Sequence, residues 1–303
     1  GGIDFNLASA DNLWTGKTFF HQAIYKNAGG NAFAAATSIK YNNGIISANM
    51  GYSFVGADFQ ADVGFVKRTG FHRFGPDLEY KFYPNEGKIL NHGPKFKFDN
   101  VLDEDLKTMD RELELKYIIN YINRSKLSAE LERGFVKLRA PFDPTNTGGD
   151  TLATGSAYNW NEFSLKYESD ARKTLNFTSN IRHGGYYNGN KLSLNGTINY
   201  RVQPYVNLSI STTYDKIDLP EPFESMAFLL IGPRLDLTFT NKLFLTTFVQ
   251  YNDQADNVNV NLRFQWRFAP VSDLFIVYTN NSYPNDFRTK DKALVAKISY
   301  WFN

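Results

Sequence analysis

The stretch that decides the fold runs from Val258 to Phe268 and reads Val-Asn-Val-Asn-Leu-Arg-Phe-Gln-Trp-Arg-Phe. Its even-numbered positions are all apolar or aromatic, and its odd-numbered positions are all Asn, Arg or Gln. Successive side chains of a β-strand point to opposite faces, whereas a helix would mix the two sets. The stretch therefore predicts a strand with one apolar face and one polar face.

The same alternation recurs along the chain, as in residues 78–82, 113–121, 192–202, 206–214 and 235–240. Many of these segments approach the ~9–11 residues that a tilted strand needs to cross a bilayer, and exceed the ~5–6 of a soluble sheet. The chain has 26 Phe and 18 Tyr, yet its mean hydropathy is negative. An apolar exterior combined with a polar interior explains both facts. We therefore predict an all-β fold, a transmembrane antiparallel β-barrel.

Asn, Gly, Asp and Pro clusters separate the predicted strands, and their dihedral preferences suit tight turns. They divide the chain into about 18 strands, with about 16 as the alternative because residues 1–25 and 56–75 alternate poorly. One predicted strand lies between the turn signals Gly56-Ala57 and Thr69-Gly70, and another turn is predicted at residues 27–30. An even count places both termini on the periplasmic side. The long turns 141–155, 218–225 and 280–290 are then extracellular, and the short turns 170–172, 203–204 and 240–242 periplasmic.

Aromatic residues recur near the ends of the predicted strands, as in the two interfacial girdles of a membrane barrel. The last predicted strand closes on Phe302 and resembles the signal read by the barrel-assembly machinery, with Asn303 as a departure. We expect outer-membrane lipid, lipopolysaccharide and that machinery as partners, in the outer membrane of a Gram-negative bacterium. The girdles comprise Tyr200, Trp266, Phe268, Tyr300 and Phe302 at one interface and Tyr214, Tyr251 and Tyr278 at the other.

Two groups of residues carry a family resemblance. One comprises Gln250-Tyr251-Asn252, Asp256-Asn257, Arg263, Trp266, Pro270, Ser272 to Phe275 and Tyr278; the other comprises Asp58-Phe59 and Gly64 to Arg68. They resemble a Bacteroidota family in which an outer-membrane barrel of unknown function follows a carbohydrate-binding family-nine-like domain. The resemblance implies no catalytic residue. It implies that a sugar-binding domain precedes Gly1. Because an outer-membrane protein must be exported and no signal peptide precedes the first predicted strand, we expect residues 1–303 to be a single barrel domain, either a mature chain or the C-terminal part of a longer one.

Charged residues alternate with apolar ones and are predicted to line the lumen. They form either a selectivity lining for polar solutes or a salt-bridged ladder that stabilises and partly fills the interior. We favour the ladder, because opposite charges alternate instead of forming rings of one sign. The residues are Glu112, Glu114, Lys116, Glu130, Glu132, Arg234, Asp236, Arg263, Arg267 and Lys297.

Several kinds of chemistry find no support in the sequence. With 33 Lys+Arg against 31 Asp+Glu there is no basic excess for nucleic acid, and the chain has no cysteine. No phosphate loop or dinucleotide fingerprint occurs, and the four histidines lack metal-site spacing. We expect no cofactor and no metal; a calcium site at Asp103 to Asp105, Asp143 or Asp150 matches no known loop. Tyr186, Tyr187 and Tyr283 could stack on sugar rings, but interfacial anchoring is the favoured interpretation.

Three functions remain open. The first is a porin-like channel or uptake protein for polar solutes, with a link to glycans implied by the resemblance; its longest turn, Pro141 to Gly155, could fold inward as a constriction. The second, nearly level with it, is a non-enzymatic structural or scaffolding subunit of a larger outer-membrane complex for secretion, assembly or glycan handling, with other envelope proteins as partners. The third, ranked well behind, is an enzyme using His72 or His183.

Overall fold

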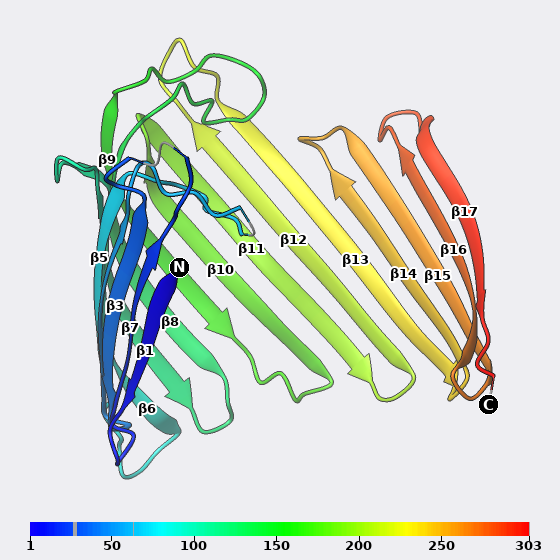
Figure 1. Ribbon diagram of the computed structural model, residues 1–303. Helices are drawn as coiled ribbons and strands as arrows, with labels where there is room; N and C mark the ends of the chain where they lie inside the picture. Colours follow the sequence, from blue (N-terminus) through cyan, green and yellow to red (C-terminus); the bar gives the residue numbers. More distant parts are fainter. Residues whose placement is uncertain (27–28, 63, 303) are drawn as a thin grey trace.

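A computed structural model describes residues 1–26, 29–62 and 64–302 of the chain (Figure 1). These residues form one antiparallel sheet, and none of them is helical. The all-β, antiparallel prediction is confirmed. The strands are β1 (Gly2–Ala8), β2 (Trp14–Gln22), β3 (Phe33–Asn42), β4 (Ile46–Val55), β5 (Phe71–Tyr80), β6 (Ile89–Leu102), β7 (Thr108–Tyr121), β8 (Lys126–Lys137), β9 (Ala157–Glu168), β10 (Leu175–Tyr186), β11 (Gly189–Val202), β12 (Val206–Asp218), β13 (Met226–Thr240), β14 (Leu243–Asn252), β15 (Asn257–Ala269), β16 (Ser272–Ser282) and β17 (Thr289–Ser299).

Each strand pairs with the next strand along the chain, so the sheet is a simple meander from β1 to β17. The stretch from Val258 to Phe268 lies in β15, where Val260 faces Val249 of β14 and Asn280 of β16. The sheet curls around a hollow interior, with β1 and β17 as the two edges of an open side (Figure 1). The sheet does not close within the described residues.

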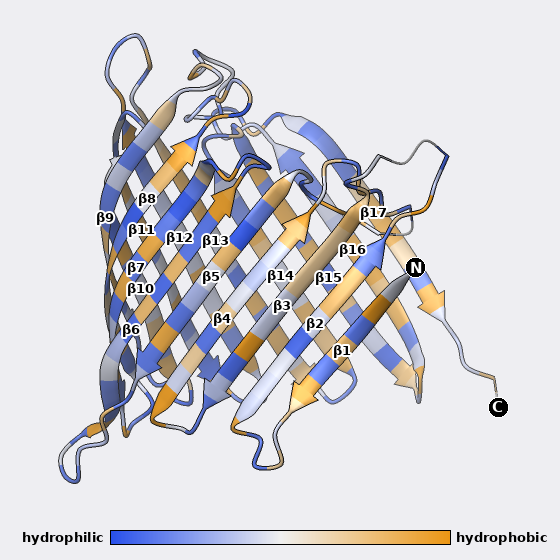
Figure 2. Ribbon diagram, turned by 60° about the vertical axis from the view of Figure 1, so that its left-hand side comes forward, coloured by the Kyte–Doolittle hydropathy of each residue, from blue (hydrophilic) through white to orange (hydrophobic). Residues whose placement is uncertain are grey.

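The two faces of the curled sheet differ in polarity, as the alternation predicts. Strands seen from outside carry alternating apolar and polar bands (Figure 2). Outward positions keep large apolar groups in contact with the surroundings, for example Leu131, Ile198 and Trp266, which are 58%, 54% and 46% exposed. Such a continuous apolar exterior has no partner within the chain, so it requires an apolar environment.

No helix in the described part of the chain is long and apolar enough to span a bilayer.

The buried apolar residues lie at one end of the sheet. Leu138 and Leu152 lie in the long loop between β8 and β9, and Leu152 is only 2% exposed. Ile217 and Leu219 lie where β12 ends, at the same end of the meander. The well-packed part of the molecule therefore supports loops, and the rest of the sheet is held by backbone pairing.

The predicted strand between Gly56 and Gly70 is wrong. The described residues of 56–70 form a loop that joins β4 to β5, so the sheet has 17 strands and neither 18 nor 16. The physical reason is visible in the sequence, because Phe65-Val66 and Lys67-Arg68 place like residues side by side and break the period of two. Gly70 adopts a positive φ of 67°, which ends the loop before β5 begins.

The loss of one strand changes the position of the termini. In a meander of 17 antiparallel strands the first and last run in the same direction, so β1 starts at the end of the sheet opposite to where β17 finishes (Figure 1). The prediction that both termini share one side is therefore wrong for the described chain. Long loops gather at one end, including 138–156, 219–225 and 283–288, and short turns at the other, including 169–174, 203–205 and 241–242. The predicted turn at 27–30 lies partly outside the described residues, as does Asn303.

The two faces can be compared by placing the same charge on neighbouring positions of β11. Leu194→Lys places an ammonium on the apolar exterior and is expected to lower the free energy of unfolding in lipid vesicles by about 2–4 kcal/mol. Asn195→Lys places it on the polar interior and is expected to change stability by less than about 1 kcal/mol. Urea unfolding followed by tryptophan fluorescence measures both. Equal costs for the two variants would contradict the assignment of the faces.

Candidate functional site on the inner face

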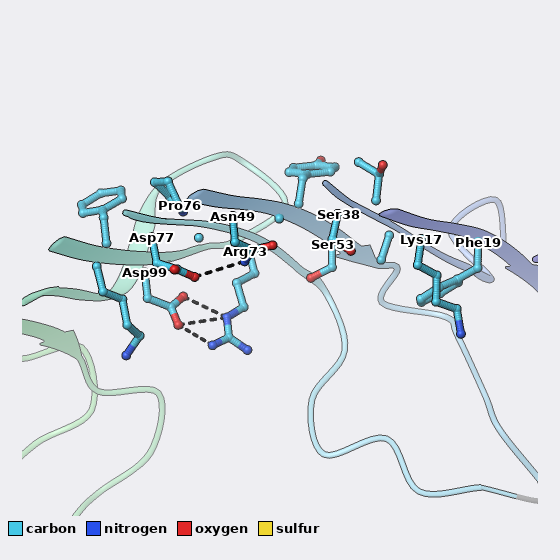
Figure 3. Close-up of a pocket in the computed structure, with 16 residues that line it drawn as sticks. Lys17, Phe19, Ser38, Asn49, Ser53, Arg73, Pro76, Asp77 and Asp99 are labelled. Atoms are coloured by element: carbon cyan, nitrogen blue, oxygen red, sulfur yellow. Dashed lines mark hydrogen bonds and ion pairs between the residues drawn. The ribbon is translucent and has the colours of Figure 1, made fainter. Parts of the chain in front are cut away.

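The interior wall over β2 to β6 is a shallow, polar recess of about 360 Å³ (Figure 3). The side chains of Arg73, Asp77 and Asp99 project from its floor on the inner side of the sheet. Arg73 Nε donates to Asp99 Oδ1 at 2.8 Å, and Asn49 donates to Asp77 Oδ2 at 3.2 Å. The recess thus presents fixed donors and acceptors to whatever occupies the interior.

An ion-pair ladder continues around the interior across β6 to β10. Lys97 pairs with Glu114 and lies 3.7 Å from Glu112, and Lys116 pairs with Glu130. The pair of Lys116 and Glu130 joins two predicted lumen residues of adjacent strands, whereas Lys97 is a cation that the prediction did not include. Every anion in the ladder has a cation nearby, and the role of these residues in the lumen remains a prediction.

Arg182 is the centre of the ladder. Its guanidinium lies 2.7 Å from Glu162, 3.6 Å from Glu132 and 3.8 Å from Glu130. The three carboxylates are only 9–15% exposed, whereas Arg182 is 38% exposed. One cation therefore screens three crowded anions while still facing the interior. Neither Arg182 nor Glu162 is among the predicted lumen residues, although both lie on the polar positions of β10 and β9.

The remaining predicted lumen residues lie on β13 to β17. Arg234 pairs with Asp236 at 3.0 Å, and Asp236 also accepts hydrogen bonds from Thr246 and Asn207. Arg263 lies over the Phe275 ring at 5.0 Å. These six side chains form two local groups, separate from the ladder on β6 to β10.

The last two predicted lumen residues lie close to the edge of the sheet. Arg267 pairs with Asp273 of β16 at 3.3 Å. Lys297 lies on the edge strand β17, opposite Phe275 in register.

The loop of residues 138–156 leans over the interior (Figure 1). Tyr186 of β10 donates to the carbonyl of Pro144 at 3.2 Å, and Gln254 of the β14–β15 turn donates to the carbonyl of Thr145 at 3.2 Å. Together with inner-face residues such as Lys191 and Asp215, which form a 3.1 Å ion pair, the loop encloses a polar pocket of about 270 Å³. This contact with β10 and the β14–β15 turn gives the loop the inward course expected of a constriction.

Asp143 organises the tip of this loop. Its carboxylate accepts hydrogen bonds from the hydroxyl of Thr145 and from the backbone N–H groups of Thr145, Asn146, Thr147 and Gly148. Desolvation by itself raises the pKa of Asp143, but the bonds from Thr145, Gly148 and Thr147 outweigh it and lower the pKa to about 2. The hydrogen bonds to the Asp143 carboxylate therefore stabilise the conformation of the loop. No group of three His, Asp or Glu side chains suited to a metal ion occurs among the described residues.

Aromatic rings pack beneath the same loop. Tyr187 lies between Phe142 of the loop, 4.9 Å away, and Trp160 of β9, 5.9 Å away, and its edge meets Tyr186 at 4.7 Å. An added Cβ at Gly134 would lie 2.3 Å from the Trp160 ring, so only glycine leaves room for this ring. Tyr186 and Tyr187, which are candidates for sugar stacking, therefore also fasten the loop to the wall.

A second loop, 56–70, also lies against the inner face. Arg68 pairs with Asp110 of β7 at 2.6 Å. Phe65 to Arg68 border a cavity of about 580 Å³ together with residues of β5, β6 and β7. Phe65 itself is 90% exposed. The poor alternation of residues 56–75 is the only sequence feature that indicates a loop here, and it does not predict the inward course.

Most of the predicted girdle residues lie near the strand ends where they are expected. Phe268 stacks on Tyr300 at 6.4 Å, and Trp266 and Phe302 extend this group at the short-turn end. Tyr200 lies near the same end, while Tyr214 and Tyr251 lie towards the long-loop end of β12 and β14, and Tyr278 lies nearer the middle of β16. Their contact with a membrane interface remains a prediction.

The two histidines of the enzyme hypothesis, His72 and His183, lie far apart on the sheet. His72 Nδ1 is 2.6 Å from the hydroxyl of Tyr52, on the apolar side of β4 and β5. His183 lies on β10, in register with Leu192 and Phe163. The two imidazoles come from distant strands and share no contact among those the structure describes.

Comparison with known proteins identifies a family. The model of the family described as "Domain of unknown function (DUF5916)" matches residues 1–243. The chain belongs to this family. The early motif from Asp58 to Arg68 lies inside the matched residues, and the motif from Gln250 to Tyr278 lies outside them. A Bacteroidota origin and a preceding sugar-binding domain remain predictions of the resemblance.

Among solved structures, the ferric enterobactin receptor PfeA of Pseudomonas aeruginosa, determined as a point mutant, is similar to this chain with a TM-score of 0.44 and 7% sequence identity. The similarity covers 98% of this chain and 68% of that chain. No curated protein matches the sequence.

Removal of the Arg182 guanidinium tests the ladder. Arg182→Met leaves three crowded carboxylates without their shared cation and is expected to lower the free energy of unfolding by about 1–3 kcal/mol, less than for a fully buried pair because Arg182 is partly solvated. Adding Glu162→Gln should recover part of the loss. The control Lys216→Met breaks an exposed pair with Asp218 and is expected to cost less than about 1 kcal/mol. Equal effects of the two single substitutions would contradict the ladder.

The order of loop 138–156 should depend on pH in a defined window. Because folding lowers the pKa of Asp143, its stabilising contribution is present above the ordinary value of 3.8 and is lost as the pH falls through about 2. Pepsin cleavage of the loop, normalised to an unfolded substrate, should stay slow at pH 4 and rise as pH 2 is approached. Asp143→Ala should be cleaved rapidly throughout, and Asp150→Asn on the same loop should behave like the parent. Rapid cleavage of the parent at pH 4 would count against this role.

Proposed function

We propose that this chain forms most of the wall of an outer-membrane barrel of a Gram-negative bacterium, in contact with lipid and lipopolysaccharide, through which polar solutes pass or are taken up. The observation that carries the proposal is the inward course of loop 138–156. A loop that is bonded to Tyr186 and Gln254 narrows the interior and leaves a small polar pocket beside it. The apolar exterior supports the membrane location, and insertion is assigned to the barrel-assembly machinery.

The proposed path runs along compensated charges. Lys97, Lys116 and Arg182 each face carboxylates, so the wall offers alternating charge of both signs instead of one. Such a surface suits neutral, hydroxyl-rich or zwitterionic solutes better than simple ions, because it supplies donors and acceptors without a strong net field. The proposal includes no covalent step and no cofactor.

The same charge compensation supports a second candidate, a structural subunit of a larger outer-membrane complex. An interior stabilised by ion pairs needs no transported solute. In that case gentle detergent extraction from the native membrane would recover other envelope proteins in fixed stoichiometry with the chain.

Single-channel recording distinguishes the channel role from the structural role. The full-length protein in a planar bilayer is expected to conduct, and replacement of residues 143–151 by a short Gly-Ser linker should raise the unit conductance roughly twofold as the constriction opens. The matched control shortens the turn at Asn85-Glu86-Gly87, at the opposite end of the sheet, and should leave conductance unchanged. Absence of current in all variants would remove the channel proposal and favour the structural role. Current that ignores the loop replacement would remove only the constriction.

A further inference from the structure

The two edges of the sheet expose unpaired backbone. β1 pairs with β2, and β17 pairs with β16, and within the described residues neither has a partner strand on its other side. A strand edge presents a row of free N–H and C=O groups, which hydrocarbon cannot satisfy. A sheet that spans a membrane must therefore have both edges covered.

The side chains of the edge strands also lack a neighbour. Ile3 of β1 and Leu294 of β17 are 74% and 72% exposed, whereas outward aliphatic residues of strands paired on both sides, such as Leu194, Ile198 and Leu131, range from 37% to 58%. The difference is the contact that an adjacent strand would supply. This higher exposure occurs on both β1 and β17, so both edge strands lack a neighbouring strand.

β1 carries few of the features that keep a free edge from pairing, and β17 carries them only towards its ends, at Lys290 to Lys292, at Lys297 and at the register shift opposite Ser282. Soluble proteins protect such edges with charged residues, proline or bulges. β1 contains one charged residue, Asp4, and the central part of β17 is the uncharged run Ala293-Leu294-Val295-Ala296. The register of β1 with β2 is regular from Gly2 to Ala8. The uncharged centres of both strands therefore leave their open sides able to pair with a further strand.

The directions of the strands restrict what can fill the seam. β1 and β17 run the same way, so joining them directly would create a parallel pair in an otherwise antiparallel barrel. An odd number of inserted strands keeps every pair antiparallel and makes the total even, as in bacterial outer-membrane barrels. A second copy of the chain would instead place β1 against β1, or β17 against β17, and leave the interior continuous between two chains.

We propose that an odd number of further strands, contributed by the polypeptide that leads into Gly1, fills the seam between β1 and β17. Gly1 already extends the backbone pairing of β1 with β2. Its carbonyl accepts a hydrogen bond from the N–H of Gln22 at 2.8 Å, and its amino group donates to the carbonyl of Gln22 at 2.9 Å. A chain that enters Gly1 through a tight turn places the preceding strand directly along the free edge of β1. The proposed barrel is therefore completed by its own polypeptide and not by a partner.

Disulfide trapping in the full-length protein tests this arrangement, because residues 1–303 contain no cysteine. Asn6→Cys on the inner side of β1 is combined with single cysteines along the segment that precedes Gly1, and Val295→Cys on the inner side of β17 is combined with the same set. The positive control is Asn6→Cys with Lys17→Cys, which are register partners across β1 and β2. Adjacent strands bring Cα atoms within the ~4.4–6.8 Å that a disulfide requires.

The proposal predicts a monomeric disulfide from Asn6→Cys to the preceding segment at every second position, a link from Val295→Cys to another part of that segment, and no link between Asn6→Cys and Val295→Cys. A monomeric disulfide between Asn6→Cys and Val295→Cys would establish direct parallel closure and overturn the proposal. A disulfide-linked dimer would assign the seam to a second copy and overturn it too. So would the absence of any link to the preceding segment when the positive control forms. None of these results depends on conductance, so the seam and the channel proposal are tested separately.

Discussion

Pairing of every backbone N–H and C=O group is the constraint on which the rest of this structure depends. Water satisfies unpaired groups on a soluble protein, but hydrocarbon does not, and the apolar outer face of this sheet requires hydrocarbon around it. The chain meets the constraint by repeating one simple operation, an antiparallel turn back onto the previous strand, from β1 to β17. Curling the sheet then turns one set of alternate side chains outward and the other inward. Within the described residues, the open seam between β1 and β17 leaves this constraint unmet along both edge strands.

Side-chain packing has an unusual distribution for a chain of this length. Leu138, Leu152 and Leu219 are buried where the long loops meet the sheet, and among the described residues no apolar core fills the middle of the hollow interior. Its place is taken by ion pairs and amide bonds, such as the group around Arg182 and the bond from Asn199 to Asn176. Because these groups border the interior, partial solvation lowers the cost of burying charge there. Packing at the loop end and the hydrogen bonds from Tyr186 and Gln254 hold loop 138–156 over the hollow, beside a small pocket of the inner face.

The sequence was sufficient to predict the position of those strands whose two faces differ strongly in polarity. Residues 258–268 separate perfectly into two sets, and β15 lies there. The sequence was insufficient to predict the loop at residues 56–70. Asp58, Gly64 and Gly70 indicate a loop there, but the apolar residues Phe59 and Phe65-Val66 led to the prediction of a strand. That single error reversed the predicted position of the N-terminus, because parity in a meander propagates from each strand to all the strands before it.

Contacts between distant strands were harder to predict than the strands themselves. Alternation identifies Arg182 as an inner-face residue, but only the register of β8, β9 and β10 brings it against Glu130, Glu132 and Glu162 together. The bond from Gln254 to the loop carbonyl of Thr145 joins residues separated by more than a hundred positions, and no local pattern encodes it. The sequence identifies residues 141–155 as a long turn, yet the inward course of the loop depends on Tyr186 and Gln254, which the curled sheet positions.

The sorting of side chains into an outer apolar face and an inner wet face is tested most directly by spin labels along β15. Single cysteines from Val258 to Phe268, each carrying a nitroxide, are measured in reconstituted vesicles for collision with oxygen, which concentrates in lipid, and with a water-soluble nickel chelate. The account predicts that oxygen accessibility is high at even-numbered positions and low at odd-numbered ones, with the nickel chelate showing the opposite alternation. Equal accessibility to the nickel chelate at every position would contradict it, because both faces of the sheet would then lie in water.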